Sequence, residues 1–164
     1  MYSVNQFISV GSVHDQVPEG TTLVIDLSRP QYCDVTWPVN SRHYTIESAF
    51  DLAEEADEMY QLMLQTIRAG KRIAIVCDDG VSVAPALVIY YLMNRKQMRL
   101  ESIRSKLIKK IPRMNIQADI YDYLTLEDKG FEEDFSEYLP ISDTPAETAR
   151  LRLIPGMPTS ANKL

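Results

Sequence analysis

The fold is decided by the stretch Ile73-Ala74-Ile75-Val76-Cys77-Asp78-Asp79-Gly80-Val81-Ser82-Val83-Ala84-Pro85-Ala86-Leu87-Val88-Ile89-Tyr90-Tyr91-Leu92-Met93. Residues 73–76 form an apolar, β-type run, which is typical of a strand buried on both faces of a sheet. A glycine-containing loop over 77–84 follows, and Pro85 suits the first turn of a helix that continues through Leu92. A strand, a glycine loop and a helix N-terminus in this order form the arrangement that holds an anion.

Apolar patterns on both sides of this stretch predict the other elements. A helix begins near Glu47 and ends at Gly70, since apolar residues recur there at steps of three and four. Its apolar face is predicted to contain Phe50, Ala53, Tyr60, Leu64 and Ile67, interrupted by Asp57. Further helices are predicted over 100–112 and 116–124, and strands over 6–11, 21–27 and, as a short edge piece, 35–39, where Pro38 cannot donate to a ladder.

Composition bounds the class of protein. The chain has 164 residues, of which 45% are hydrophobic and 24% charged, values typical of one globular domain. The formal net charge of -6 argues against nucleic-acid and anionic-membrane partners. Two separate cysteines, Cys33 and Cys77, and two isolated histidines form neither a disulfide framework nor a metal site. We therefore expect an intracellular, cytoplasmic protein with no cofactor, no bound metal and no membrane span.

The loop and the helix after it resemble the signature of the dual-specificity protein phosphatase family. That signature runs His-Cys-x-x-Gly-x-Ser-Arg-Ser and continues into a Leu-Val-Ile-x-Tyr-Leu-Met helix. The resemblance covers about the first 128 residues, in order and with few gaps. It implies an α/β, protein-tyrosine-phosphatase-like fold with a central, mostly parallel sheet of four to five strands flanked by helices. The chain would then divide into a domain over 1–128 and an acidic, proline-containing tail over 129–164.

The resemblance also identifies where this loop departs from a working one. Cys77 stands at the nucleophile position, but Val83 stands where the family has its phosphate-binding arginine, and Ala84 replaces the following hydroxyl residue. Counting ten residues back from Phe50 places Asn40, which has no proton to donate, at the general-acid position. The phosphate loop itself comprises Cys77, Asp78, Asp79, Gly80, Val81, Ser82, Val83 and Ala84. Losing a bidentate guanidinium and a general acid each costs about 10²-fold or more in rate.

The acidic residues in the loop add to these losses. Asp78 and Asp79 form a solvated turn, exclude phosphate, or bind a cationic group of a partner. His43 is either a substitute acid or an exposed loop residue. The prediction is a catalytically impaired, pseudophosphatase-like protein that acts in protein binding, scaffolding or assembly. The alternatives are a slow or selective Cys77-dependent phosphatase and a non-hydrolysing phosphoprotein binder.

Two regions are candidates for contacting protein partners, and the oligomeric state stays open. The basic region Arg95–Arg113 is either a solvated helix face, a dock for an acidic partner, or a dock for the chain's own acidic stretch over 127–137. The second region is the C-terminal tail. Its last residues, Asn162-Lys163-Leu164, are a loose variant of the Ser-Lys-Leu peroxisomal address.

Overall fold

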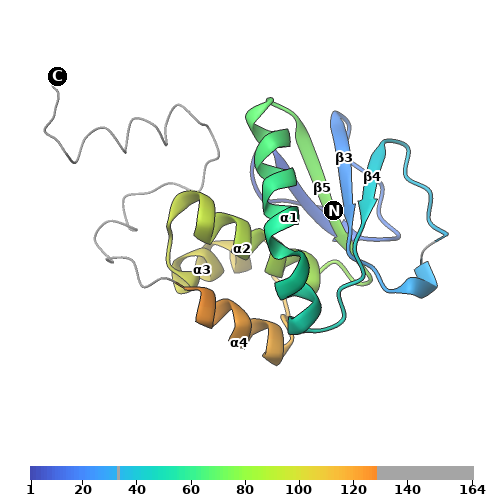
Figure 1. The fold of residues 1–164 in the computed structure, drawn as a ribbon. Helices are drawn as coiled ribbons and strands as arrows, with labels where there is room; N and C mark the ends of the chain where they lie inside the picture. Colours follow the sequence, from blue (N-terminus) through green and yellow to red (C-terminus); the bar gives the residue numbers. More distant parts are fainter. Residues whose placement is uncertain (33, 129–164) are drawn as a thin grey trace, which may run out of the picture.

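A computed structural model of the chain describes residues 1–32 and 34–128. Its elements in chain order are β1 (Tyr2–Ser3), β2 (Ile8–Ser12), β3 (Thr21–Asp26), the short 3₁₀ helix η1 (Pro30–Tyr32), β4 (Asn40–His43), α1 (Ala49–Arg68), β5 (Arg72–Cys77), α2 (Val83–Lys96), α3 (Leu100–Lys110) and α4 (Ala118–Glu127). The strands form one sheet in the order β1-β2-β5-β3-β4. Helices α1 to α4 gather on one face of this sheet (Figure 1).

The sheet is mostly parallel, as predicted. β2, β5, β3 and β4 run parallel to their neighbours, and only the short β1 pairs antiparallel, with β2. The apolar run of β5 occupies the centre, with Ile8 of β2 opposite Ile73 and Ile25 of β3 opposite Ile75. Both faces of β5 are buried, which explains why its sequence is apolar without alternation.

The sheet face away from the helices is covered by loops. The small side chains of Val24, Ala74 and Val76 are buried there, and Trp37 packs against them from the segment after η1. The indole N–H of Trp37 donates to the carboxylate of Asp26, at 3.0 Å. This bond satisfies a carboxylate that is itself buried, so a loop can close this face without leaving a charge unpaired.

Strand β4 differs from the prediction in position. The predicted edge piece over 35–39 is not a strand; the edge strand is Asn40–His43. Pro38 lacks an N–H and lies just before the strand, in agreement with its effect on a ladder. All residues of β4 are exposed and polar, so hydrophobic alternation gave no signal there. Pairing with β3 alone defines this strand.

Helix α1 is close to its predicted bounds, but its buried face is different. The buried residues are Leu52, Ala56, Met59, Met63 and Ile67, so of the five apolar residues predicted for this face only Ile67 is fully buried. The side chain of Phe50 is 69% exposed. Apolar residues lie on two neighbouring rows of this helix, and the choice between them depends on how the helix docks. The helix begins where the Ser48 hydroxyl accepts a hydrogen bond from the Asp51 N–H.

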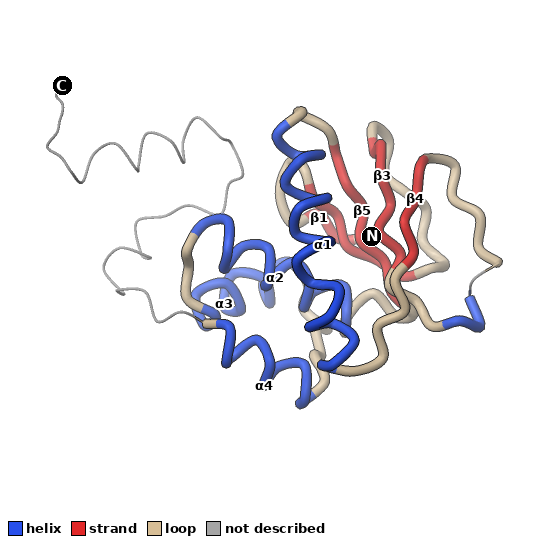
Figure 2. Tube along the Cα trace, in the orientation of Figure 1, coloured by secondary structure: helices blue, strands red, loops and turns tan. Residues whose placement is uncertain are grey.

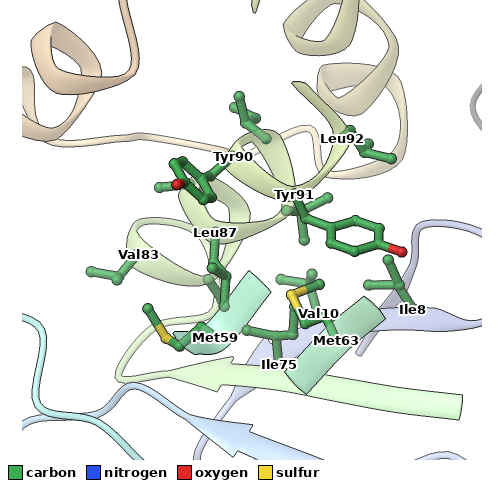
Figure 3. Close-up of a cluster of buried hydrophobic side chains, with 14 of the residues drawn as sticks. Ile8, Val10, Met59, Met63, Ile75, Val83, Leu87, Tyr90, Tyr91 and Leu92 are labelled. Atoms are coloured by element: carbon green, nitrogen blue, oxygen red, sulfur yellow. The ribbon is translucent and has the colours of Figure 1, made fainter. Parts of the chain in front are cut away.

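The core lies between the sheet and the helix layer. Met63 of α1 and Leu87 of α2 point toward Val10 and Ile75 of the sheet (Figure 3). α2 is buried on nearly every side, because it lies between the sheet and the other helices. Figure 2 shows this arrangement, with the helices beside the strands and β4 at the outer edge.

Helices α3 and α4 complete the layer and match the two predicted helices. α3 buries Leu100, Ile103 and Leu107, and α4 buries Ile120 and Leu124. No helix within 1–32 and 34–128 is both long and apolar enough to cross a membrane. Cys33, the tail over 129–164 and its terminal Asn162-Lys163-Leu164 lie outside the described residues.

Candidate functional site

A cavity of about 780 Å³ opens where the parallel strands β3 and β5 end. The carboxyl ends of parallel strands are the usual position of sites in α/β folds, because the loops that follow them converge there. Among its lining residues are Arg29, Glu47, Cys77, Asp78, Asp79 and Ser82. Of the predicted loop residues, Cys77, Asp78, Asp79, Ser82 and Val83 therefore line one cavity, together with residues from other segments, Arg29 and Glu47 among them.

Cys77 is the last residue of β5 and is buried at the floor of the loop. Its sulfur accepts a hydrogen bond from the Ala84 N–H at 3.4 Å, and its thiol donates to Oδ1 of Asp79 at 3.5 Å. Burial raises the pKa of the Cys77 thiol by more than the N–H groups of Ala84 and Ser82 lower it. The Asp79 charge raises that pKa further. The sulfur is therefore a thiol at neutral pH, and only the thiolate is a strong nucleophile.

Gly80 fixes the shape of the loop. Its φ of 77° lies in the left-handed region, which side-chain-bearing residues rarely adopt. A Cβ atom at this position would lie 2.7 Å from the carbonyl carbon of Gly11 and 2.8 Å from the N of Ser12. The loop therefore packs against the end of β2 and admits no side chain at Gly80. The chain turns tightly at this residue.

The carboxylate of Asp79 occupies the anion cradle of the loop. Its Oδ1 accepts hydrogen bonds from the N–H of Val81 at 3.0 Å, the N–H of Ser82 at 3.2 Å and the hydroxyl of Ser82 at 2.9 Å. Burial alone would raise the pKa of Asp79, but the bonds from Val81 and Ser82 outweigh it and hold the pKa below its usual value. The start of α2 thus receives its negative charge from within the chain.

Asp78 binds Arg29, the one arginine among the described residues that line the cavity. Oδ1 of Asp78 accepts the backbone N–H of Arg29 at 3.0 Å. Oδ2 of Asp78 accepts the side-chain Nε–H of Arg29 in a charge-assisted bond. This hydrogen bond raises the pKa of Arg29, which stays a cation. The pair joins the loop after β3 to the loop after β5.

The arginine position of the family signature carries a buried aliphatic side chain here. Val83 is the first residue of α2 and is 6% exposed, and Ala84 behind it is fully buried. The helix therefore begins two residues earlier than the prediction from Pro85. The loop is closed on its other side by Val81, whose carbonyl accepts the Asn115 N–H at 2.8 Å. No guanidinium comes from position 83, and the wall there is apolar.

The general-acid region is arranged differently from the prediction. Asn40 is the first residue of β4, opposite Leu23, and does not line the cavity. His43 ends the same strand, where its Nε2 lies 2.9 Å from the carbonyl oxygen of Ser28. The loop that reaches the cavity covers residues 44–48, and it contributes the carboxyl group of Glu47. Counting back from Phe50 took no account of an edge strand over 40–43.

Sequence reasoning missed Arg29 and Glu47 as cavity residues. Their positions in the chain could have indicated them, because Arg29 follows β3 and Glu47 lies between β4 and α1. Both segments lie at the carboxyl edge of the sheet, where sites in α/β folds form. Among the residues that the structure describes, no group of three or more His, Cys, Asp or Glu side chains is placed to hold a metal ion. The described residues of the cavity bring together the Cys77 thiol, the carboxylates of Glu47, Asp78 and Asp79, and the Arg29 guanidinium.

A mostly parallel five-stranded sheet whose glycine loop joins β5 to α2 defines a protein-tyrosine-phosphatase-type α/β fold. Human DUSP28 has this fold, with a TM-score of 0.70 and 20% identity over 78% of this chain and 92% of that one. The human tyrosine phosphatase-like serine/threonine/tyrosine-interacting protein gives 0.70 at 13% identity, covering 78% and 95% of the two chains.

A third similar structure is a leucine-rich repeat and phosphatase domain protein from Entamoeba histolytica. Its TM-score is 0.64 at 18% identity, over 78% of this chain and 90% of that one. No protein-family model and no curated protein sequence matches the chain. At these identities the likeness shows the fold: the chain is dual-specificity-phosphatase-like in architecture.

Proposed function

We propose that this protein is a pseudophosphatase, a phosphatase-like domain used for protein binding, scaffolding or assembly rather than hydrolysis. The observation that carries the proposal is the Asp79 carboxylate in the anion cradle. A phosphate dianion would have to displace that carboxylate from the N–H groups of Val81 and Ser82. The displaced charge would then lie beside the dianion, and like charges at such distances repel strongly.

Three further features support the same function. Val83 gives no bidentate guanidinium to bind the phosphoryl oxygens, a contact typically worth several kcal/mol in the transition state. Cys77 is protonated, so little of it is available as a nucleophile. The Arg29 guanidinium is held by Asp78. The fold itself is retained with a well-packed core, as a binding module requires.

A comparison protein with this fold is named as phosphatase-like and interacting, which is the role proposed here. The partner of the present chain would be a protein, contacted through the basic region Arg95–Arg113, the tail or the altered cavity. With a net charge of -6, the chain is poorly suited to nucleic acid or to anionic membranes.

Hydrolysis of a small aryl phosphate tests the proposal. The purified protein is compared with its Cys77→Ser variant over a range of pH. The expected rate is equal in both proteins and near the uncatalysed background. A rate that disappears in Cys77→Ser would overturn the proposal, because it would make the thiol a working nucleophile.

A slow phosphatase is the second candidate, and one observation favours it. Arg29 and Glu47 line the same cavity as Cys77, and they are of the two chemical types that the loop has lost. Arg29→Lys and Glu47→Gln each test this candidate. If Cys77-dependent hydrolysis is found, both variants should lower it by about 10²-fold or more.

A further inference from the structure

We propose that a second copy of this chain docks on the basic face of α3 through the acidic first half of its own α1. The basic face comprises the exposed cations beyond the first turn of α3, which are Arg104, Lys106, Lys109, Lys110 and Arg113. The acidic face comprises the carboxylates of α1 over 51–58, which are Asp51, Glu54, Glu55, Asp57 and Glu58. Neither face includes a residue that lines the cavity, so this inference does not depend on the proposed function.

The two faces carry opposite charges, and neither segment contains a counterion of its own. The segment over 104–113 has five lysines and arginines and no aspartate or glutamate. The segment over 51–58 has five aspartates and glutamates and no lysine or arginine. Surfaces of opposite charge steer two molecules together and fix the register of their contact. The complement of the basic face is therefore present on every copy of the chain.

The basic face carries repulsion that the described part of the chain does not relieve. Lys106 and Lys109 are exposed, and neither forms an ion pair with another residue that the structure describes. Lys106 lies one helical turn before Lys110, and like charges three and four residues apart on a helix repel each other. The helix dipole favours cations in the last turn, which explains Lys109 and Lys110 but not Lys106. An anionic surface from outside the chain would relieve this repulsion.

The acidic face shows the same imbalance and adds an exposed aromatic ring. Glu54 and Glu55 pair with no cation among the described residues, whereas Glu58 lies 3.7 Å from the guanidinium of Arg42. Phe50 lies one turn before Glu54, hence on the same side of α1, and its side chain is 69% exposed. Aromatic side chains are enriched in protein interfaces, where they supply apolar contact area. Phe50 would therefore be covered in the docked pair.

The geometry of the helices favours contact between two copies. Helix α2 packs against both α1 and α3 and lies between them, so the two faces of one chain do not meet (Figure 1). The rise from Glu54 to Glu58 and the rise from Lys106 to Lys110 are both about 6 Å. Two helices lying side by side can thus place carboxylates opposite cations at the same interval. Because two different faces meet, the contact is heterologous and continues from copy to copy.

Charge reversal on either face of the full-length chain tests this inference. The basic-face variant is Lys106→Glu/Lys109→Glu, and the acidic-face variant is Glu54→Lys/Glu55→Lys. At low ionic strength, the average mass of the unmodified protein in sedimentation equilibrium should rise above that of one chain between micromolar and millimolar concentration. Each variant alone should stay at the mass of one chain, because side chains that attract across the contact then repel. An equimolar mixture of the two variants should associate again, since the new glutamates meet the new lysines.

A control, an aromatic variant and salt complete the test. Lys71→Glu/Arg72→Glu changes the net charge as the basic-face variant does, at exposed residues outside both faces, and should still associate. Phe50→Ser should weaken the association, and about 1 M salt, where the Debye length is about 3 Å, should abolish it.

Three results would overturn the inference. The first is an unmodified protein that stays at the mass of one chain at every concentration, which would leave the basic face to an acidic segment of a different protein. The second is association that survives either charge reversal. The third is a mixture of the two variants that stays dissociated while both show the melting transition of a folded domain.

Discussion

Asp79→Ala removes the carboxylate from the anion cradle and leaves the backbone of the loop in place. The N–H groups of Val81 and Ser82 lose their acceptor, but both are near the solvent and can bind water instead. The loss of stability should therefore be similar to that caused by removing the N-cap side chain of a helix, about 1 kcal/mol. For a domain of this size, that corresponds to a melting temperature lower by roughly 3–6 °C.

Adding phosphate should stabilise the folded state of the Asp79→Ala variant. The vacated cradle has two backbone N–H groups at a helix N-terminus and no longer contains a competing anion. If phosphate then binds with a dissociation constant of about 1 mM, a tenfold excess over that value stabilises the folded state by about 1.4 kcal/mol. This is enough to reverse the loss, so the melting temperature should rise by several degrees with phosphate. The unmodified protein should show no such rise.

The assay is a thermal melt across a phosphate series, with Glu47→Gln as the matched control. That control removes one negative charge from the same cavity but leaves Asp79 in the cradle. If the Asp79 carboxylate excludes phosphate by occupying the cradle, phosphate should raise the melting temperature of the Asp79→Ala variant only. An equal rise in the melting temperature of Glu47→Gln would refute the reasoning. The negative charge of the cavity as a whole, and not the Asp79 carboxylate in the cradle, would then exclude phosphate. No rise for either variant would refute it as well.

Three other predictions follow from the described residues. Cys77 should be alkylated by iodoacetamide much more slowly than a free thiol at pH 8, because burial raises its pKa, and Asp79→Ala should speed that reaction. Burial raises the pKa of Tyr123 to about 12. The stability that neutral Tyr123 contributes is therefore present below about pH 10 and is lost as the pH rises toward 12. Ultraviolet titration of the tyrosines, compared with unfolding at alkaline pH, checks this. Gly80→Ala should cost more than Gly70→Ala, which should cost about 1 kcal/mol. Both have φ of 77°, but only Gly80 has backbone atoms within 3.0 Å of an added Cβ, and denaturant melts measure the difference.

The sequence predicted the sheet and the helix order because buried elements carry strong patterns. The run over 73–76 and the loop after it defined the centre of the fold, and the structure agrees in topology. Strand β4 was misplaced because an exposed edge strand of polar residues has no hydrophobic period. The buried face of α1 was misjudged for a related reason: Phe50 and Met59 are both apolar, and only docking decides which row faces the core.

The sequence predicted the loop residues of the site but neither its other members nor its geometry. The sequence places Asp79 near an anion cradle, yet whether it repels a ligand or replaces one depends on the angle at which the loop turns. That angle is set by Gly80, which lies against the backbone of β2, a contact between segments about 70 residues apart. Arg29 and Glu47 likewise reach the cavity through strand order, which single positions do not encode.

The changes in the loop are chemically coupled rather than independent losses. A bound phosphate dianion needs both the N–H cradle and a guanidinium, since the cradle alone compensates only part of two charges. A single carboxylate needs less, and here the N–H groups of Val81 and Ser82, a hydroxyl and the start of α2 suffice for Asp79. With that smaller anion in place, an apolar Val83 leaves no charge unpaired in the cradle, and a thiol at Cys77 can donate where a thiolate would repel. The loop is therefore a consistent structure in its own right, in which the chain supplies the anion that a substrate would otherwise provide.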